Sequence, residues 1–155
     1  MINEAYVTEP EAEPVEDTIR VILFDSHETV REGLRHMLGD DESIKVIAEA
    51  STTRELLDKA ETLTPDVVII GEVESSNYDT SSTIRCLGEG RSPCRVIVIN
   101  DERRFLVPAV RAGAVGFLKR KVSRSELTAA IRIVHLWHRV LADQTKGSHF
   151  ALVNL

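Results

Sequence analysis

The stretch from Pro65 to Glu72 constrains the fold more than any other part of the chain. Its centre is four consecutive β-favouring apolar residues, entered through a proline and closed by Gly71. A strand without polar alternation belongs in the middle of a parallel sheet that helices cover on both faces. In such sheets the functional crevice lies beyond the carboxyl ends of the central strands. The residue at that end, Gly71, has no side chain that could perform chemistry.

Strand and helix signals alternate along the rest of the chain. Short apolar runs predict further strands at 19–24, 44–48, 95–99 and 115–118, with helices between and after them. The last helix starts at a capping box of Ser123 and Glu126 and runs to about residue 142. This alternation predicts an α/β, flavodoxin-like three-layer sandwich, with five helices and a five-stranded parallel sheet of order 2-1-3-4-5.

Charge and length divide the chain into three segments. Residues 1–18 carry six acidic side chains and no Lys or Arg, and the remaining residues balance at 19 acidic against 19 basic. We predict a disordered acidic leader at 1–18, one folded domain at 19–142 and a C-terminal tail or linker at 143–155. Neither the acidic leader nor the neutral domain has the basic patch that nucleic-acid binding requires.

Composition also indicates the cellular compartment in which the protein is expected. No apolar run approaches the roughly 20 residues that span a bilayer, and the N-terminus has no basic region of a secretory signal. Cys86 and Cys94 do not have the spacing of a zinc site, so we interpret them as two reduced thiols. We therefore expect a cytoplasmic protein without membrane contact, cofactor or metal.

Five stretches in chain order resemble the receiver domain of two-component response regulators. They read VILFDSHETVREGL, PDVVIIGE, VIVIN, AVRAGAVGFLKR and SELTAAI, and they cover about residues 19–142. The first and fourth are similar to the subgroup usually fused to a LuxR-type helix-turn-helix. The resemblance implies phosphoryl transfer to an aspartate, with Mg²⁺ held by acidic neighbours and with a hydroxyl and a lysine on the phosphoryl oxygens.

Carried over position by position, the resemblance leaves the reacting centre incomplete. The acidic pair of the family falls on Asp25 and Ser26, so one of two metal carboxylates is missing. The phospho-acceptor position falls on Gly71, which cannot be phosphorylated. We therefore interpret the domain as a pseudo-receiver with a degenerate phosphorylation pocket and no catalytic residue.

The other pocket positions are also changed. The switch hydroxyl falls on Asn100, the aromatic switch position on Phe117, and the lysine on Arg120 unless a one-residue slip brings in Lys119. One alternative follows from this set. Asn100 and Arg120 could hold an anion in the vacated pocket through an amide and a guanidinium fork, which would make the domain a small-molecule or anion sensor.

A second alternative keeps the phosphorylation chemistry on a displaced carboxylate. Glu72 and Asp101 stand near the crevice, although period-two alternation is expected to turn Glu72 away from the acceptor site. His27 matches a histidine of the family at the start of a helix. We expect His27 to have a structural or capping role rather than to carry protons.

The last helix carries a second apolar stripe beside the one assigned to the core. Its candidate interface residues are Ile133, Leu136, Trp137 and Val140. A surface helix normally has a single apolar face, so the second stripe needs a cover. The chain's own segment 150–153 is one candidate, and self-association or a partner protein is the other.

These observations predict a non-catalytic signalling module that acts through protein contacts, homodimerises and does not depend on aspartate phosphorylation. In the family that it resembles, such domains control an attached transcription output. The 13 residues after position 142 are too few for a helix-turn-helix. We therefore expect DNA contact only through an output domain that this chain does not contain.

Overall fold

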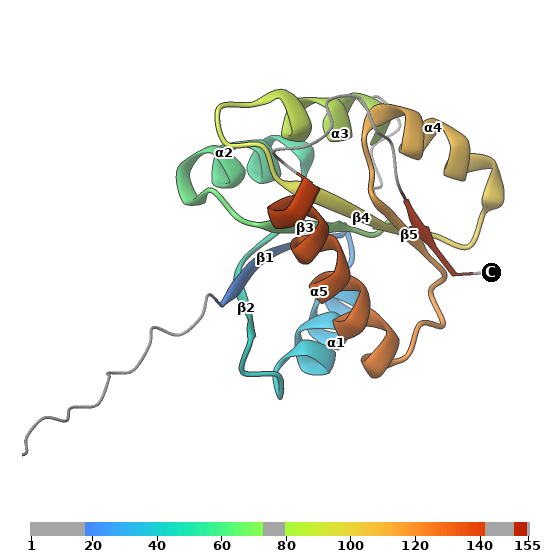
Figure 1. The fold of residues 1–155 in the computed structure, drawn as a ribbon. Coiled ribbons are helices and arrows are strands. Elements are labelled where there is room, and N and C mark those ends of the chain that lie inside the picture. The colour runs from blue at the N-terminus through green and yellow to red at the C-terminus, as the bar shows by residue number, and fades with distance from the viewer. Residues whose placement is uncertain (1–17, 73–79, 142–150, 155) are drawn as a thin grey trace, which may run out of the picture.

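The computed structural model of the chain describes residues 18–72, 80–141 and 151–154, with side chains in the last helix described as far as Trp137. Within these ranges strands and helices alternate as the sequence predicts (Figure 1). Apart from Thr18, the predicted leader lies outside the described residues, as does the segment 142–150.

The sheet is parallel, and its strands follow the order β2-β1-β3-β4-β5-β6. The strands are β1 (Ile19–Phe24), β2 (Ile44–Ala50), β3 (Val67–Ile70), β4 (Arg95–Ile99), β5 (Gly116–Leu118) and β6 (Leu152–Val153). All four residues of β3 are buried, and β3 pairs with β1 and β4. The predicted order 2-1-3-4-5 is confirmed, and a short sixth strand extends the sheet beyond β5.

The helices form the two outer layers. They are α1 (Glu28–Leu38), α2 (Thr53–Leu63), α3 (Thr80–Glu89), α4 (Leu106–Ala112) and α5 (Arg124–Leu141), and a 3-10 turn, η1 (Arg103–Phe105), precedes α4. Helices α1 and α5 cover one face of the sheet, and α2, α3 and α4 cover the other (Figure 1).

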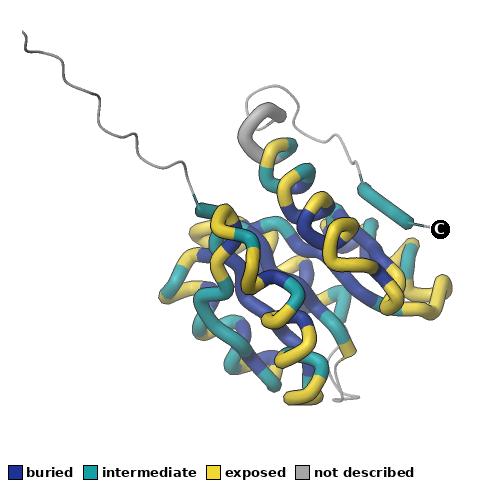
Figure 2. Tube along the Cα trace, turned by 90° about the horizontal axis from the view of Figure 1, so that it is seen from below, coloured by how far each residue is buried: buried dark blue, intermediate teal, exposed yellow. Residues whose placement is uncertain are grey.

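The core has one half on each side of the sheet because strand side chains alternate. In β1, Val21 and Leu23 belong to the half under α1 and α5, whereas Ile22 and Phe24 belong to the half under α2, α3 and α4. Figure 2 shows the buried sheet enclosed by helices whose outer sides are exposed. Burying each large apolar side chain contributes about 1.5–3 kcal/mol.

Local capping fixes the starts of two helices. Thr52 caps α2 by accepting a hydrogen bond from the backbone N–H of Glu55 at 3.2 Å. The predicted capping box before α5 is confirmed, since Ser123 N–H donates to Glu126 Oε1 at 2.8 Å and Glu126 N–H donates to Ser123 Oγ at 3.1 Å. Such reciprocal bonds satisfy N–H groups that a helix start leaves unpaired.

Candidate functional site

The candidate site lies where β1 and β3 end side by side. Phe24 and Ile70 are register partners at the last step of this ladder, so Asp25 and Gly71 emerge next to each other. The backbone of the two loops stays paired beyond the strands: Gly71 N–H donates to Phe24 O at 2.7 Å, and Ser26 N–H donates to Glu72 O at 2.9 Å. The two loops therefore leave the sheet side by side with their backbones hydrogen-bonded to each other.

Asp25 is fully buried in this frame, and its carboxylate is satisfied by N–H groups. Oδ1 accepts from the backbone N–H of His27 at 2.8 Å and lies 3.1 Å from the His27 ring atom Nδ1. Oδ2 accepts from the backbone N–H of Glu72 at 2.8 Å. Charge-assisted bonds of this kind are among the stronger ones in proteins, so Asp25 ties the start of α1 to the end of β3.

His27 occupies the N-cap position of α1, but its side chain makes no capping bond to the helix. Its ring faces Asp25 instead, and this contact gives it a structural role. The sequence left capping and structural roles open for His27. The contact with Asp25 assigns the His27 side chain a structural role and not a capping role.

Gly71 has no side chain, and the Asp25 carboxylate fills the space that one would need. A Cβ built on Gly71 would overlap Asp25 Oδ2 and lie 3.0 Å from Asp25 Cγ. The resemblance predicts Asp25 as a metal ligand beside the acceptor position. In the structure its carboxylate instead reaches into the acceptor position itself, an arrangement that only the missing side chain at residue 71 permits.

Glu72 and Arg120 form an ion pair at the mouth of the crevice. Arg120 Nη2 lies 2.5 Å from Glu72 Oε1, and both side chains are about half exposed. Strand β3 ends at Ile70, so strand alternation does not extend to residue 72, and its side chain pairs with Arg120. The backbone N–H of Arg120 also donates to Asp101 Oδ1 at 2.9 Å.

The two candidates for the lysine position at the end of β5 have different contacts. Arg120 contacts Glu72 in the crevice, whereas the backbone N–H of Lys119 donates to Asn154 Oδ1 at 2.8 Å, on the side of β6. The backbone of Lys119 therefore faces the edge strand β6, whereas the Arg120 side chain contacts Glu72.

Asn100 and Phe117 are the remaining predicted pocket residues. Asn100 Oδ1 accepts from Glu102 N–H at 2.8 Å, which makes a local turn after β4, and Asn100 N–H donates to Leu118 O at 2.9 Å. Phe117 is only 5% exposed and packs in the core under α2, α3 and α4. The aromatic ring is thus part of the core and not of the crevice surface.

Comparison with known proteins relates the sequence of the chain to one family. Residues 21–132 match the family described as the response regulator receiver domain. This chain belongs to that family. The receiver is 30% identical over 128 residues to response regulator GacA of Pseudomonas viridiflava, and 30% identical over 127 residues to response regulator UvrY of Escherichia coli K12.

Those alignments cover 81% of this receiver but only 59% of GacA and 58% of UvrY. The chain therefore spans about three fifths of the length of the curated relatives that it matches. Among solved structures, the signal receiver domain of response regulator NarL from Mycobacterium tuberculosis superposes with a TM-score of 0.71 at 26% identity. That match covers 78% of this receiver and 98% of the NarL domain, which confirms the flavodoxin-like fold.

Two further properties of the described residues concern metal binding and membranes. Within these residues no group of three or more His, Cys, Asp or Glu side chains gathers as a metal site. In the same part of the receiver no helix is long and apolar enough to cross a membrane.

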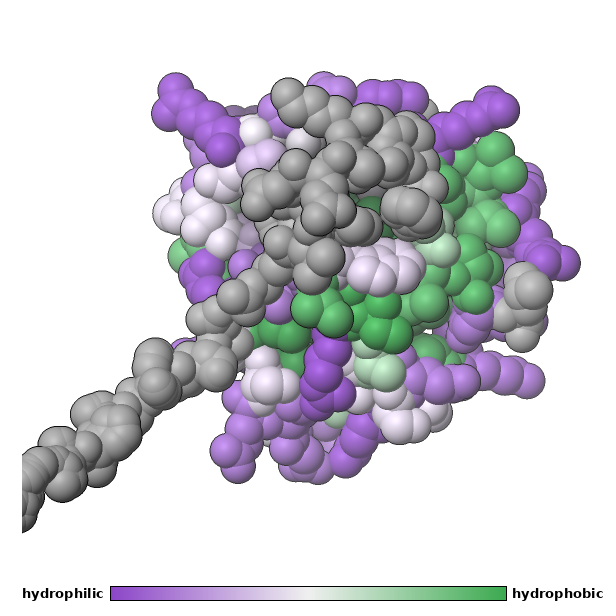
Figure 3. All heavy atoms as spheres, viewed as in Figure 1, coloured by the Kyte–Doolittle hydropathy of each residue, from purple (hydrophilic) through white to green (hydrophobic). Residues whose placement is uncertain are grey.

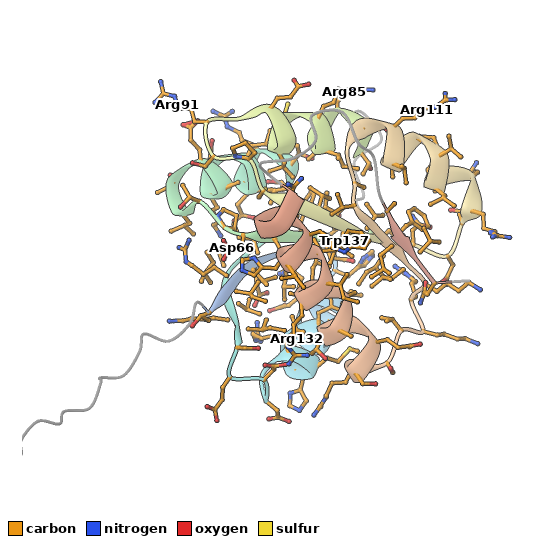
Figure 4. The ribbon with its side chains drawn as sticks, viewed as in Figure 1. Asp66, Arg85, Arg91, Arg111, Arg132 and Trp137 are labelled. Carbon is orange, nitrogen blue, oxygen red and sulfur yellow. The ribbon has the colours of Figure 1, made fainter. Side chains whose placement is uncertain are left out.

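The predicted stripes of α5 separate by burial. The core stripe is buried, with exposures of 0–2% at Leu127, Ala130, Ile131 and Val134. In the second stripe Ile133 and Trp137 are half-buried and Leu136 is 57% exposed, while the side chain of Val140 lies outside the described residues. Figure 3 shows apolar surface over α5 and toward α4, and Figure 4 marks Trp137 on α5.

The segment predicted as one cover for this stripe lies at the edge of the sheet. Leu152 and Val153 pair with β5 as strand β6, and Leu136 remains exposed in their presence. Residue 150, the first of the predicted cover, lies outside the described residues. Leu136 is therefore exposed apolar surface on the described part of α5.

Proposed function

We propose that this receiver is an atypical, non-catalytic signalling module that acts through protein contacts and independently of aspartate phosphorylation. The observation that carries the proposal is the pair of Asp25 and Gly71. The acceptor position has no carboxylate, and the neighbouring carboxylate fills the vacated volume. Phosphoryl transfer needs a nucleophile with access to the donor, and Gly71 supplies none.

Asp25 does not replace the missing acceptor. Its side chain has no solvent-exposed surface, and both carboxylate oxygens are bonded to N–H groups of His27 and Glu72. Mg²⁺ usually keeps several water ligands and needs near-octahedral geometry, which a buried, bonded carboxylate does not offer. These contacts support a structural role for Asp25 in place of metal binding.

The displaced carboxylates give weaker support for a phosphoacceptor. Glu72 already pairs with the Arg120 guanidinium, and Asp101 accepts from the Arg120 backbone. Both are exposed, so a phosphodonor could reach them, and this keeps the displaced phosphoacceptor as an alternative to be tested. Because both carboxylates already have a partner on Arg120, we favour a structural role for Glu72 and Asp101.

The half-exposed Arg120 also keeps the anion-sensor alternative in view. A guanidinium at a crevice mouth suits a carboxylate or phosphate ligand. In this receiver Glu72 takes that place, with Arg120 Nη2 2.5 Å from Glu72 Oε1. An anion would have to displace Glu72, which makes the sensor reading the less favoured one.

The output of the proposed module is transcriptional regulation in the cytoplasm. GacA and UvrY are response regulators that extend well beyond the part matched here. We propose that this receiver controls such an additional output domain, which alone would contact DNA. We further propose that it homodimerises through the second stripe of α5, since exposed apolar and aromatic side chains on a helix mark interfaces.

The deciding experiment incubates the protein with Mg²⁺ and acetyl phosphate and records intact mass and sedimentation velocity on the same sample. The expected result is no gain in mass and a dimer that is present with and without the donor. A receiver that does have an aspartate acceptor serves as the positive control for the reagent. A mass gain of one phosphoryl group would overturn phosphorylation independence and point to Glu72 or Asp101.

A further inference from the structure

The outer edge of β5 is occupied by a short strand from the end of the chain. Strand β6 runs parallel to β5, with Gly116 opposite Leu152 and Phe117 opposite Val153. Leu152 N–H donates to Val115 O at 2.8 Å, and Asn154 N–H donates to Phe117 O at 3.4 Å. Figure 1 shows this strand beside β5 at the edge of the sheet.

The edge of β5 contacts the side chains of this segment as well as its backbone. Leu152 packs against the core half under α1 and α5, whereas Val153 packs against the half under α2, α3 and α4. The Asn154 side chain accepts a hydrogen bond from Lys119 N–H at 2.8 Å. A segment that docks here therefore needs two adjacent apolar residues followed by a short side chain with an acceptor oxygen.

Few interactions hold residues 151–154 on the edge of β5. Residues 151–154 are all only half-buried, and the backbone bond from Asn154 N–H to Phe117 O is long at 3.4 Å. A typical intramolecular hydrogen bond contributes about 0.5–1.5 kcal/mol net, so the segment opens at a small fraction of the cost of global unfolding. Ten residues separate Leu141 from Leu152, and a chain of that length spans up to about 33 Å when extended.

We propose that the β5 edge is a strand-docking site that takes residues 151–154 of a second copy by reciprocal exchange. This inference rests on the proposed homodimerisation and names the segment exchanged. Exchange preserves every contact that the segment makes within one chain, so its main cost is the association of two copies. Because only ten residues connect α5 to β6, association through α5 would hold the partner's segment at high local concentration.

The test traps the segment on the edge with a disulfide between two different chains. Val115 and Ala151 each stand one residue before the register pair Gly116 and Leu152, at a spacing that neighbouring strands make suitable for a disulfide. One chain carries Val115→Cys, the other carries Ala151→Cys, and both carry Cys86→Ser because Cys86 is exposed. Burial raises the pKa of the Cys94 thiol to about 11, so Cys94 stays protonated during oxidation at mild pH.

A matched control places the second cysteine on the opposite edge of the sheet. Lys45→Cys lies on β2, is exposed, and reports disulfides that form by random collision. Strand exchange predicts a covalent heterodimer from the Val115→Cys and Ala151→Cys chains in at least about tenfold excess over the Lys45→Cys pairing, because docking raises the local thiol concentration.

The experiment distinguishes a failure of strand exchange from a failure of homodimerisation. A chain that carries both Val115→Cys and Ala151→Cys reports docking within one molecule. If this chain closes internally and mixed chains cross-link no more than the Lys45→Cys control, strand exchange is wrong. Homodimerisation itself still stands if the same samples sediment as dimers, and it falls together with the exchange if they sediment as monomers.

Discussion

The carboxylate of Asp25 and a side chain at position 71 exclude each other. A Cβ on Gly71 would overlap Asp25 Oδ2, while that oxygen accepts the backbone N–H of Glu72 at 2.8 Å. The absence of a side chain at residue 71 and the inward position of the Asp25 carboxylate therefore depend on each other. Any substitution that adds a side chain at residue 71 must also move the Asp25 carboxylate.

Gly71→Ala is therefore expected to destabilise the receiver by about 1–3 kcal/mol, a typical cost of overpacking a filled site. The added methyl group must displace the Asp25 carboxylate from Glu72 N–H, because neither backbone at this step of the sheet can yield easily. Urea unfolding at neutral pH measures the loss.

The partner variant isolates the cause. In an Asp25→Ala background, which itself leaves buried N–H groups unpaired, Gly71→Ala should cost much less, with an interaction energy of about 1 kcal/mol or more in the double-mutant cycle. Additive effects of the two substitutions would show that Gly71→Ala acts through some contact other than Asp25.

Mg²⁺ should not stabilise this receiver. An ion held at 100 times its dissociation constant would add about 2.7 kcal/mol to the free energy of unfolding. Asp25 has no exposed surface and its oxygens are bonded to N–H groups, so we expect equal melting temperatures in MgCl₂ and in NaCl of matched ionic strength. A rise specific to Mg²⁺ that disappears in Asp25→Asn would contradict this account.

The start of α2 gives a prediction for pH. The N–H of Ser51 donates to Glu55 Oε1 at 2.7 Å and lowers the pKa of the Glu55 carboxyl below its usual range, with Lys59 as a smaller cause. A carboxyl whose pKa is lower in the folded state stabilises the fold above its unfolded pKa of about 4.3 and loses that contribution as pH falls through the folded value.

The stability deficit of Glu55→Gln should therefore be largest near neutral pH and shrink in acid. Thr52→Ala removes an uncharged cap at the same helix start, and its deficit of about 1 kcal/mol should stay constant over this window. Thermal unfolding of both variants between neutral pH and acid compares them directly. A deficit of Glu55→Gln that does not change with pH would refute the linkage.

Much of the fold follows from the sequence because its signals are local. The unbroken apolar run of β3 predicts a central strand, and the Ser123 and Glu126 pair predicts the start of α5; both are confirmed. Strand β6 has only two residues, Leu152 and Val153, which is too short for a periodic pattern. Its position is set by pairing with a distant edge and not by its own composition.

The sequence predicted which residues lie near the site, but not the directions of their side chains. The resemblance locates Asp25, Gly71 and Arg120 at the crevice by their places after strands. The direction of the Asp25 side chain depends on empty space on a neighbouring strand, 46 positions further along the chain at Gly71. The reach of Glu72 to Arg120 depends on the exact end of β3, which sequence patterns define least well.

Matched substitutions can distinguish the proposed dimer face on α5 from the exposed apolar surface on α4. Leu136 on α5 is 57% exposed and Val107 on α4 is 54% exposed, so a glutamate at either position should leave the monomer folded. We expect Leu136→Glu and Trp137→Glu to weaken self-association by about 2 kcal/mol or more, because a charge is then buried against an apolar partner. Val107→Glu should leave the dimer intact. Sedimentation equilibrium of the three variants gives the dissociation constants, and a dimer lost only in Val107→Glu would move the interface from α5 to α4.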